Sequence, residues 1–256
     1  MIVDTHIHTL FSSDSKMTIN QALQKANELG VAITVTEHMD LAYPEPDAFV
    51  FDITDYFNEY EKYRSENLYL GIELGMRQDC IADNSTIVMN NQFDYVIGSI
   101  HVIDNIDIYN EDFYHMRSKQ EVYHQYFDSM ISCLKTYDFI DSLGHIDYIA
   151  RYARFENPEI YYNEYSEKID KVLKILAQNQ KAIEINTRRI ADPATLEALI
   201  PIYKRFYALG GRIATAGSDA HKPEDIGKNF NIAMNIAEMC NLKLVYFENR
   251  VPHFIK

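Results

Sequence analysis

The chain contains few cysteines, no long apolar run and fewer basic than acidic residues. Its three cysteines, Cys80, Cys133 and Cys240, are widely spaced and form no CxxC pair, which argues against a disulfide framework and against a zinc finger. No apolar run reaches membrane-spanning length, and the residues after Met1 do not form the basic and then apolar region of a signal peptide. We therefore expect a cytoplasmic protein without a membrane partner.

The shortage of positive charge limits the partners that the chain can bind. With 24 Lys and Arg against 38 Asp and Glu, the formal net charge at pH 7 is -14, and such a negative field repels polyanions. We expect no nucleic-acid partner. A small phosphate ester is compatible with this charge, because bound divalent cations can dominate the potential at a local site.

The overall composition is that of a globular protein, with 47% hydrophobic and 24% charged residues. No internal repeat or linker interrupts the 256 residues, and a single α/β barrel uses most of a chain of this length. We predict one domain that covers residues 1–256. The sequence predicts no particular oligomeric state.

Short apolar runs rich in β-branched residues alternate with longer segments of helical periodicity. In one such segment, apolar residues recur every four positions from Val122 to Leu134 and lie on one helix face. The alternation predicts βα units and a mostly parallel sheet, either open and doubly wound or closed into a barrel. The seven predicted strands are residues 2–3, 31–35, 68–72, 95–100, 140–143, 182–185 and 212–216.

His6 and His8 follow the first predicted strand with one residue between them. In an extended chain, alternate side chains point to the same face, so both imidazoles can reach one metal ion. A pair of solvated loop histidines fits the same two residues equally well, since short motifs often occur by chance. The pair alone leaves both interpretations open.

Residues of the same kind follow the later predicted strands. They are Glu37 and His38 after the second strand, Glu73 after the third, His101 after the fourth, His145 after the fifth, and Asp219 and His221 after the seventh. Solvated or core histidines need not coincide with strand ends, where barrel enzymes place their catalytic groups. The set therefore predicts a metal site, and its distribution around the chain favours the barrel over the open sheet.

The predicted ligands mix imidazole nitrogen with carboxylate oxygen. This mixture suits zinc, manganese or iron, whereas magnesium and calcium prefer oxygen ligands almost exclusively. Because the candidates are too numerous for one tetrahedral ion, we expect two or three divalent ions. The remaining histidines, His115, His124 and His253, lie away from predicted strand ends, and we expect them to be solvated.

Five further residues have two interpretations each. Asp14 follows Ser12 and Ser13 and, on spacing alone, is better explained as a helix cap than as a ligand. Four arginines after the fifth and sixth strands can bind phosphate oxygens or pair with surface carboxylates. They are Arg151, Arg154, Arg188 and Arg189. We expect one or two of the four to bind a substrate anion.

Taken in order, these segments resemble the PHP (polymerase and histidinol phosphatase) superfamily. The segments are Asp4-Thr5-His6-Ile7-His8, Thr36-Glu37-His38, Glu73, Ser99-Ile100-His101, Gly144-His145-Ile146-Asp147, Glu184-Ile185-Asn186 and Gly217-Ser218-Asp219-Ala220-His221. Within that family the chain is similar to the free-standing histidinol-phosphatases. The resemblance implies a distorted seven-stranded (β/α) barrel and hydrolysis of L-histidinol phosphate, a small-molecule phosphate ester of histidine biosynthesis.

The resemblance also implies a trinuclear metal cluster and assigns its ligands. His6, His8, Glu73 and Asp219 would hold one ion, Glu73 would bridge to a second held by His101 and His145, and Asp14, His38 and His221 would hold the third. Glu73 and Asp219 would be catalytic, because the ions that they hold would share a bridging hydroxide that attacks phosphorus. Asp4 would lie behind the ligands and orient them. Three tyrosines, Tyr43, Tyr148 and Tyr152, are candidates to line an imidazole pocket.

Three alternatives remain open. Another small ester, such as a nucleotide or sugar phosphate, fits the cluster residues equally well, because they report the reaction type rather than the substrate. A metal-dependent amidohydrolase also begins with HxH after a first barrel strand, although the bridging lysine common after its fourth strand is missing from Ser99-Ile100-His101. The third alternative is a non-catalytic metal-binding module, as in PHP domains that degenerate inside polymerases.

Overall fold

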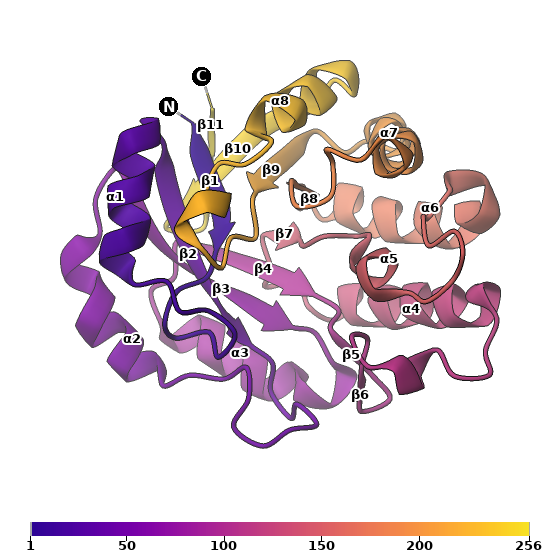
Figure 1. Cartoon of the computed structure of the whole chain (residues 1–256), viewed down its shortest axis with the longest axis horizontal. Helices are drawn as coiled ribbons and strands as arrows, with labels where there is room; N and C mark the ends of the chain where they lie inside the picture. Colours follow the sequence, from indigo (N-terminus) through magenta and orange to yellow (C-terminus); the bar gives the residue numbers. More distant parts are fainter. Residues whose placement is uncertain (1, 256) are drawn as a thin grey trace.

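The computed structural model describes residues 2–255 as a mostly parallel sheet surrounded by helices (Figure 1). The strands of the main sheet lie in the order β1-β2-β3-β4-β7-β8-β9-β10-β11. Neighbours up to β10 pair in parallel, and β11 returns antiparallel to β10. Because strands adjacent in the sheet follow one another along the chain, most of the helices that connect them cover its outer side. The short helix α5 (Tyr148–Tyr152) lies instead at the carboxyl ends of the strands.

The elements have the following bounds. The strands of the main sheet are β1 (Val3–Ile7), β2 (Ala32–Met39), β3 (Leu68–Gly75), β4 (Tyr95–Ser99), β7 (Ser142–Leu143), β8 (Ala182–Asn186), β9 (Ile213–Gly217), β10 (Lys243–Glu248) and β11 (Val251–Phe254). A separate hairpin pairs β5 (Val102–Ile103) with β6 (Ile106–Asp107). The helices are α1 (Ile19–Leu29), α2 (Ile53–Tyr60), α3 (Ile81–Asn90), α4 (Lys119–Leu134), α5 (Tyr148–Tyr152), α6 (Tyr162–Gln178), α7 (Pro193–Ala208) and α8 (Phe230–Met239). Short 3-10 turns are η1 (Glu61–Tyr63), η2 (Gln78–Cys80), η3 (Glu111–Phe113) and η4 (Pro223–Asp225).

The predicted parallel α/β arrangement is confirmed, and all seven predicted strands are present as β1, β2, β3, β4, β7, β8 and β9. The limits differ most at β1 and β2, which continue past residues 3 and 35 to Ile7 and Met39. His6 and His38 are therefore strand residues, and His38 pairs with Glu73 of the neighbouring strand. The count of seven omits β10, although its residues 244–247 form an apolar and aromatic run.

Local signals explain where the helices begin and end. α1 begins with a capping box, in which Thr18 caps the backbone of Gln21 and the Gln21 side chain returns to Thr18. It ends at Gly30, whose φ of 65° lies in the left-handed region that glycine adopts without strain. α7 begins at Pro193 behind the Asp192 cap, where proline loses no helical hydrogen bond.

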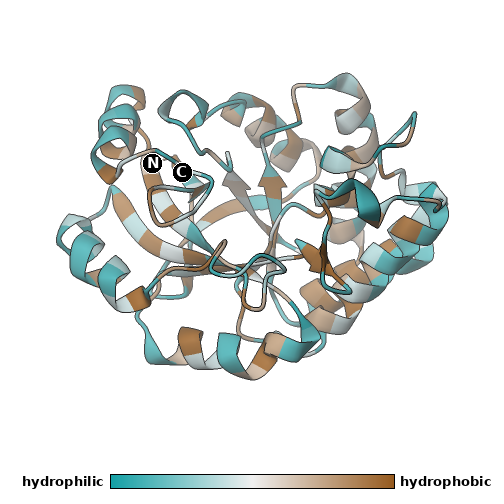
Figure 2. Ribbon diagram, turned by 60° about the horizontal axis from the view of Figure 1, so that its bottom comes forward, coloured by the Kyte–Doolittle hydropathy of each residue, from teal (hydrophilic) through white to brown (hydrophobic). Residues whose placement is uncertain are grey.

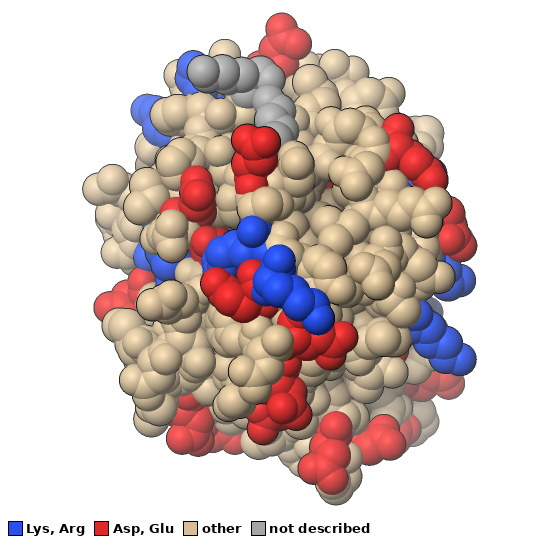
Figure 3. Space-filling view, turned by 90° about the vertical axis from the view of Figure 1, so that its left-hand side faces the viewer, with Lys and Arg blue, Asp and Glu red and all other residues tan. Residues whose placement is uncertain are grey.

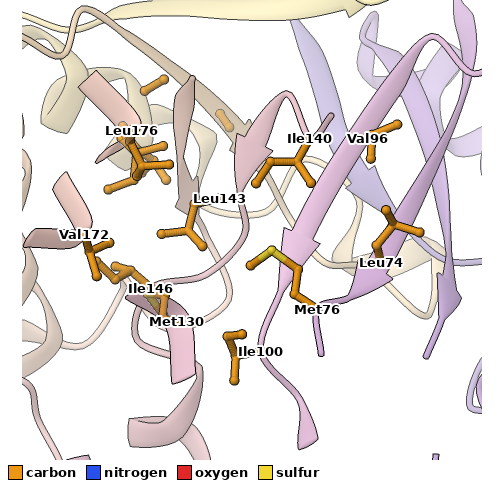
Figure 4. Close-up of a cluster of buried hydrophobic side chains, with 14 of the residues drawn as sticks. Leu74, Met76, Val96, Ile100, Met130, Ile140, Leu143, Ile146, Val172 and Leu176 are labelled. Atoms are coloured by element: carbon orange, nitrogen blue, oxygen red, sulfur yellow. The ribbon is translucent and has the colours of Figure 1, made fainter. Parts of the chain in front are cut away.

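The main core lies between the sheet and the helices. Figure 4 shows part of it, with Leu74 and Val96 from β3 and β4 and with Met130, Val172 and Leu176 from α4 and α6. All five side chains are buried, and full burial of one such side chain contributes about 1.5–3 kcal/mol. The helix faces that point away from the sheet are largely hydrophilic (Figure 2).

A smaller apolar cluster joins β10 to β4. Val245 and Phe247 of β10 pack against Tyr95 at the amino end of β4, where the rings of Phe247 and Tyr95 stack at 5.1 Å.

On the face shown in Figure 3, acidic and basic side chains are intermixed. Among residues 2–255, no helix has the length and apolarity that a membrane crossing requires.

Candidate metal centre

The predicted ligands meet at the carboxyl ends of the parallel strands. His6, His38 and Glu73 belong to β1, β2 and β3, His8 and Asp14 follow β1, His101 follows β4, His145 follows β7, and Asp219 and His221 follow β9. All are buried except His221, which is half-buried, and Asp14, which is exposed. Residues from six parts of the chain thus come together at one end of the sheet.

The first donor group joins two imidazoles with two carboxylates. His6 Nε2 and His8 Nε2 lie 3.0 Å apart, and Glu73 Oε2 is 3.3 Å from the first and 3.5 Å from the second. Asp219 Oδ1 lies 3.9 Å from His6 Nε2 and 3.6 Å from His8 Nε2. Four ligand-type atoms thus converge on one point, as in a four-coordinate metal site.

Glu73 links this group to a second one through its other oxygen. Glu73 Oε1 lies 2.9 Å from His145 Nε2 and 3.4 Å from His101 Nε2. It also accepts a hydrogen bond of 2.7 Å from the Ser99 hydroxyl. One carboxylate therefore faces both groups, which is the arrangement that a bridging ligand requires.

The third donor group is nearest the surface. Asp14 Oδ2 lies 3.0 Å from His221 Nε2 and 3.8 Å from His38 Nε2. The ring of His8 stacks on those of His38 and His221, at centroid distances of 4.1 and 4.3 Å. Asp14 therefore lies beside ligand-type residues, while Thr18 caps the following helix.

These groups fit divalent cations. Glu73 Oε2 and His101 Nε2 are buried and have no hydrogen-bond partner among the described residues, which is costly unless a ligand satisfies them. Three sets of His and Glu atoms are close enough to share an ion: His8, His38 and His221; His6, His8 and Glu73; and His38, Glu73 and His101. The mixed nitrogen and oxygen donors suit zinc or a similar transition metal.

The charges of the centre keep its carboxylates ionised. Burial by itself would raise the pKa of Glu73, but the nearby His6 and His101 hold it well below its usual value. Burial would likewise raise the pKa of Asp219, and Arg151 and His6 again hold it well below its usual value. Ionised carboxylate is the form that binds a metal ion.

Two carboxylates that the sequence analysis assigned no role hold the imidazoles in place. Glu184 Oε1 accepts a hydrogen bond of 2.6 Å from His6 Nδ1, and Asp40 Oδ1 accepts one of 2.8 Å from His101 Nδ1. Each leaves the other ring nitrogen directed at Glu73. Glu184 lies one residue before the end of a predicted strand, and Asp40 alternates with His38, so the sequence pattern of both is similar to that of the ligands.

The structure places Asp4 behind the ligands, as expected, although its contacts are to backbone groups and a hydroxyl. Its Oδ1 accepts a hydrogen bond of 3.4 Å from the backbone N–H of His6. Its carboxylate accepts hydrogen bonds from the backbone N–H groups of Ser218 and Gly227, at 2.8 and 2.9 Å, and from the Ser218 hydroxyl. Asp4 thus fastens the segment after β9, which carries Asp219, rather than an imidazole ring. Despite these hydrogen bonds, burial raises the pKa of Asp4 to about 6.

Comparison with known proteins agrees with this geometry. The PHP domain family model matches residues 4–188. The chain belongs to the PHP family. It is 50% identical to a probable histidinol-phosphatase of Clostridium acetobutylicum over 254 residues, which cover 99% of this chain and all of the relative. It is 31% identical to the histidinol-phosphatase of Lactococcus lactis subsp. lactis over 86% of this chain and 84% of that protein.

A solved structure resembles this PHP chain over nearly its whole length. It is the crystal structure of histidinol phosphate phosphatase from Lactococcus lactis subsp. lactis, complexed with zinc, L-histidinol and phosphate. The TM-score is 0.91 at 27% sequence identity, and the match covers 98% of each chain.

Two of the four predicted arginines reach this PHP centre. Arg151 is largely buried, and its Nη1 donates to Asp219 Oδ2 at 2.7 Å. Its Nη2 donates to Asn186 Oδ1 at 3.3 Å. Arg188 is half-exposed, and its Nη1 lies 3.6 Å from Asp219 Oδ1. Both guanidinium groups therefore flank a carboxylate of the first donor group.

The structure does not bring the other two arginines to the ligands. Arg189 pairs with Asp147, at 2.8 Å, and with Glu159. Arg154 lies near the rim, where its Nε is 3.4 Å from Glu111 Oε1. Nothing in the sequence pattern separates these two arginines from Arg151, because all four follow strand ends.

A cavity of about 380 Å³ opens over the second and third donor groups. Its lining residues are Asp14, His38, Asp40, Tyr43, Glu45, Phe49, His101, Asp107, Tyr109, Tyr148 and Tyr152. The ring centroid of Tyr148 lies 4.8 Å from that of His101 and 5.1 Å from that of Tyr152. All three tyrosines expected to line an imidazole pocket thus lie in one aromatic and acidic cavity beside the ligands.

Proposed function

We propose that this chain is a histidinol-phosphatase, which hydrolyses L-histidinol phosphate to L-histidinol and phosphate. The observation that carries the proposal is the cavity of aromatic and acidic side chains that opens directly onto the donor groups. The full-length likeness to a structure that holds zinc, L-histidinol and phosphate supports the same substrate. The relatives named as histidinol-phosphatases support the same reaction.

The proposed centre holds two or three divalent ions, with zinc, manganese and iron as candidates. His6, His8, Glu73 and Asp219 bind one ion, Glu73 with His101 and His145 binds a second, and Asp14, His38 and His221 bind the third. When bound, such ions neutralise charge on the phosphoryl oxygens and lower the pKa of the attacking water. Glu73 and Asp219 are the proposed catalytic carboxylates, because both face the first donor group.

The arginines next to this centre bind the phosphate in the proposed complex. Arg151 is held between Asp219 and Asn186, so its guanidinium is ordered before substrate arrives. Arg188 is half-exposed beside the same carboxylate. A guanidinium can donate two parallel hydrogen bonds to phosphate oxygens, which lysine cannot do.

The cavity suits the histidinol part of the substrate, as the arginines suit its phosphate. Histidinol phosphate carries an imidazole and an ammonium group, which need an aromatic surface and a negative partner. Tyr148 and Tyr152 supply the surface, with their rings 5.1 Å apart. Asp107, which accepts a hydrogen bond from the Tyr43 hydroxyl, supplies a carboxylate at the same cavity.

A substrate panel tests this proposal. The purified chain is treated with chelator, reconstituted with Zn²⁺ or Mn²⁺, and assayed for phosphate release from histidinol phosphate, a nucleotide, a sugar phosphate and p-nitrophenyl phosphate. We expect the metal-loaded enzyme to prefer histidinol phosphate. Equal kcat/KM values across the panel would refute the specific assignment and leave a general phosphoesterase.

Matched variants test whether the cluster carries the reaction. We expect Glu73→Gln to abolish turnover and lower the metal content, because Glu73 faces two donor groups. His124→Ala is the control, since His124 is exposed on α4. Unchanged hydrolysis by the Glu73 variant would remove the cluster from the mechanism.

The proposed fold is a distorted seven-stranded barrel that forms one domain over residues 1–256. The support is an isolated parallel bridge between Ile7, at the end of β1, and Ala220, after β9. Backbone hydrogen bonds from His8 N to Ala220 O (2.8 Å) and from Asp219 N to His6 O (2.7 Å) flank it. These contacts join the end of β1 to the segment after β9 at the ligand end.

A further inference from the structure

A serine hydroxyl behind the ligand His8 contacts three polar groups at once. Ser12 is buried in the loop after β1. Its Oγ lies 2.5 Å from Glu37 Oε2, 3.1 Å from the backbone nitrogen of His38 and 3.0 Å from His8 Nδ1. His8 thus differs from His6 and His101, whose Nδ1 atoms contact a carboxylate directly.

With Glu37 ionised, the donors and acceptors around Ser12 allow only one arrangement. A hydroxyl donates one hydrogen and accepts through two lone pairs, a backbone N–H only donates, and a carboxylate only accepts. The Ser12 hydrogen therefore goes to Glu37, and one Ser12 lone pair accepts the N–H of His38. The remaining lone pair must accept a hydrogen from His8 Nδ1.

Glu37 is itself held as an acceptor. Its oxygens accept hydrogen bonds from the backbone N–H of Thr9, at 2.9 and 3.1 Å, and from the Thr9 hydroxyl. It is fully buried and lies beside His38 in β2, where neighbouring side chains point to opposite faces. It is not a ligand, and a buried carboxylate is costly unless it has such partners.

We propose that Glu37 is a positioning residue of the metal centre: through the Ser12 hydroxyl it holds His8 as the tautomer protonated at Nδ1, with the Nε2 lone pair directed at the first donor group. This inference rests on the metal centre of the proposed function. It does not depend on the identity of the substrate. His8 Nε2 lies 3.0 Å from His6 Nε2 and 3.5 Å from Glu73 Oε2, where a proton would block metal binding.

The isosteric variant Glu37→Gln should reverse the direction of the hydrogen bonds that link Glu37, the Ser12 hydroxyl and His8 Nδ1. The carboxamide oxygen can still accept from Thr9, which places the amide N–H₂ toward Ser12. The Ser12 hydroxyl would then accept from the amide and turn its hydrogen toward His8 Nδ1. We expect the His8 proton to move to Nε2 and the Zn²⁺ affinity to fall by roughly 10- to 100-fold, as is usual when a residue that orients a ligand is changed.

The tautomer can be observed without any assay of activity. The chelated full chain, labelled with ¹⁵N-histidine, is studied by long-range ¹H–¹⁵N spectra at pH 8, and His8 is assigned from the signals lost in His8→Asn. We expect the parent to show hydrogen on Nδ1 and Glu37→Gln to show hydrogen on Nε2. Zn²⁺ affinity is measured in parallel by competition with a chromophoric chelator.

Two further variants complete the test. Ser12→Ala removes the hydroxyl that links Glu37 to His8 but keeps Glu37. We expect a mixture of both His8 tautomers and a similar loss of Zn²⁺ affinity. Tyr60→Phe is the matched control, because the Tyr60 hydroxyl contacts Thr9 Oγ1 at 2.7 Å in the same buried cluster; it should leave the tautomer and the affinity unchanged.

The outcomes separate this inference from the proposed function. Nδ1 protonation of His8 in the parent, Glu37→Gln and Ser12→Ala alike would overturn the inference, whatever the phosphatase activity. The expected tautomer shift in a chain that does not hydrolyse histidinol phosphate would support the inference and reject the substrate.

Discussion

At the scale of single residues, the hydrogen bond on one ring nitrogen of a histidine decides what the other nitrogen can do. His6 and His101 each donate through Nδ1 to a carboxylate, and His221 Nδ1 lies 2.9 Å from the backbone oxygen of Asp219. Such partners fix the orientation of the ring and raise its basicity as a ligand. Nε2 of each imidazole is thereby left for the metal centre.

Arg151 is the arginine whose replacement should most affect phosphate binding. Arg151→Lys keeps the charge but loses the planar guanidinium group, whose two terminal nitrogens bond Asp219 and Asn186. We expect kcat/KM for histidinol phosphate to fall roughly 10- to 100-fold, which corresponds to about 1.5–3 kcal/mol for a charged hydrogen bond. Arg212→Lys is the control, since Arg212 Nη1 donates to the backbone oxygens of Tyr207 in α7 and of Gly211 before β9, at 2.9 and 2.7 Å. Equal losses in both variants would contradict a specific role.

The cysteines should react slowly with thiol reagents in the native protein. Cys80, Cys133 and Cys240 are buried and form no disulfide within the described part of the chain, as their spacing predicted. Burial raises the pKa of Cys133 to about 11, so at pH 8 only about one molecule in a thousand carries its reactive thiolate. A colorimetric thiol assay at pH 8 should titrate all three cysteines rapidly only after denaturation. Fast native labelling of Cys133 would disprove this.

At the scale of elements, two glycines let neighbouring segments approach one another closely beside the ligands. A Cβ on Gly217 of β9 would lie 2.3 Å from His6 Cβ and 2.5 Å from Glu184 Oε1. A Cβ on Gly144, after β7, would lie 2.3 Å from Ser99 Oγ, which bonds Glu73. Glycine at these positions therefore permits the ligand geometry.

We expect Gly217→Ala to damage both stability and metal binding. The added methyl group must push β9 away from β1, and overpacking of this kind costs about 1–3 kcal/mol. The free energy of unfolding by urea and the zinc content by elemental analysis are the measurements.

Gly30→Ala provides the comparison for Gly217→Ala. It places alanine in a left-handed conformation but meets nothing within 4 Å, so it should lower stability by about 1–2 kcal/mol and leave the zinc content unchanged. Full zinc content in Gly217→Ala would show that the close approach is not required.

At the scale of the whole molecule, the metal centre depends on the complete fold. Its residues run from His6 to His221, and the last strand that carries ligands meets the first through the bridge between Ile7 and Ala220. No part of the chain holds a full donor group by itself. Metal binding and global folding should therefore be coupled.

Chelation should lower the melting temperature of the whole chain. Ions that bind only the folded state stabilise it by about 4 kcal/mol when their concentration is a thousand times Kd. By calorimetry we expect one unfolding transition, which shifts to lower temperature with chelator and returns with Zn²⁺ or Mn²⁺. Two separate transitions would contradict the single domain, and an unchanged Tm would contradict coupled binding.

Much of this arrangement can be predicted before folding is considered. The alternation of apolar runs with helical periodicity identifies all seven strands that carry or adjoin ligands, because strand formation depends on local residue type and pattern. The ligand-type residues at the ends of those strands can also be predicted, because their distance from each strand is a local property of the sequence. β10 is not among the predicted strands, because its apolar run, residues 244–247, is followed by the hairpin strand β11 rather than by a segment of helical periodicity.

The partners of the ligands were decided by the tertiary structure. Glu184 bonds His6 across 178 residues of sequence, Asp4 bonds Ser218 rather than an imidazole, and Arg189 pairs with Glu159 while Arg151 reaches Asp219. A local pattern tells which face of a strand a side chain occupies. It cannot tell which distant side chain lies within 3 Å, because a hydrogen bond depends on how segments far apart in the chain are packed.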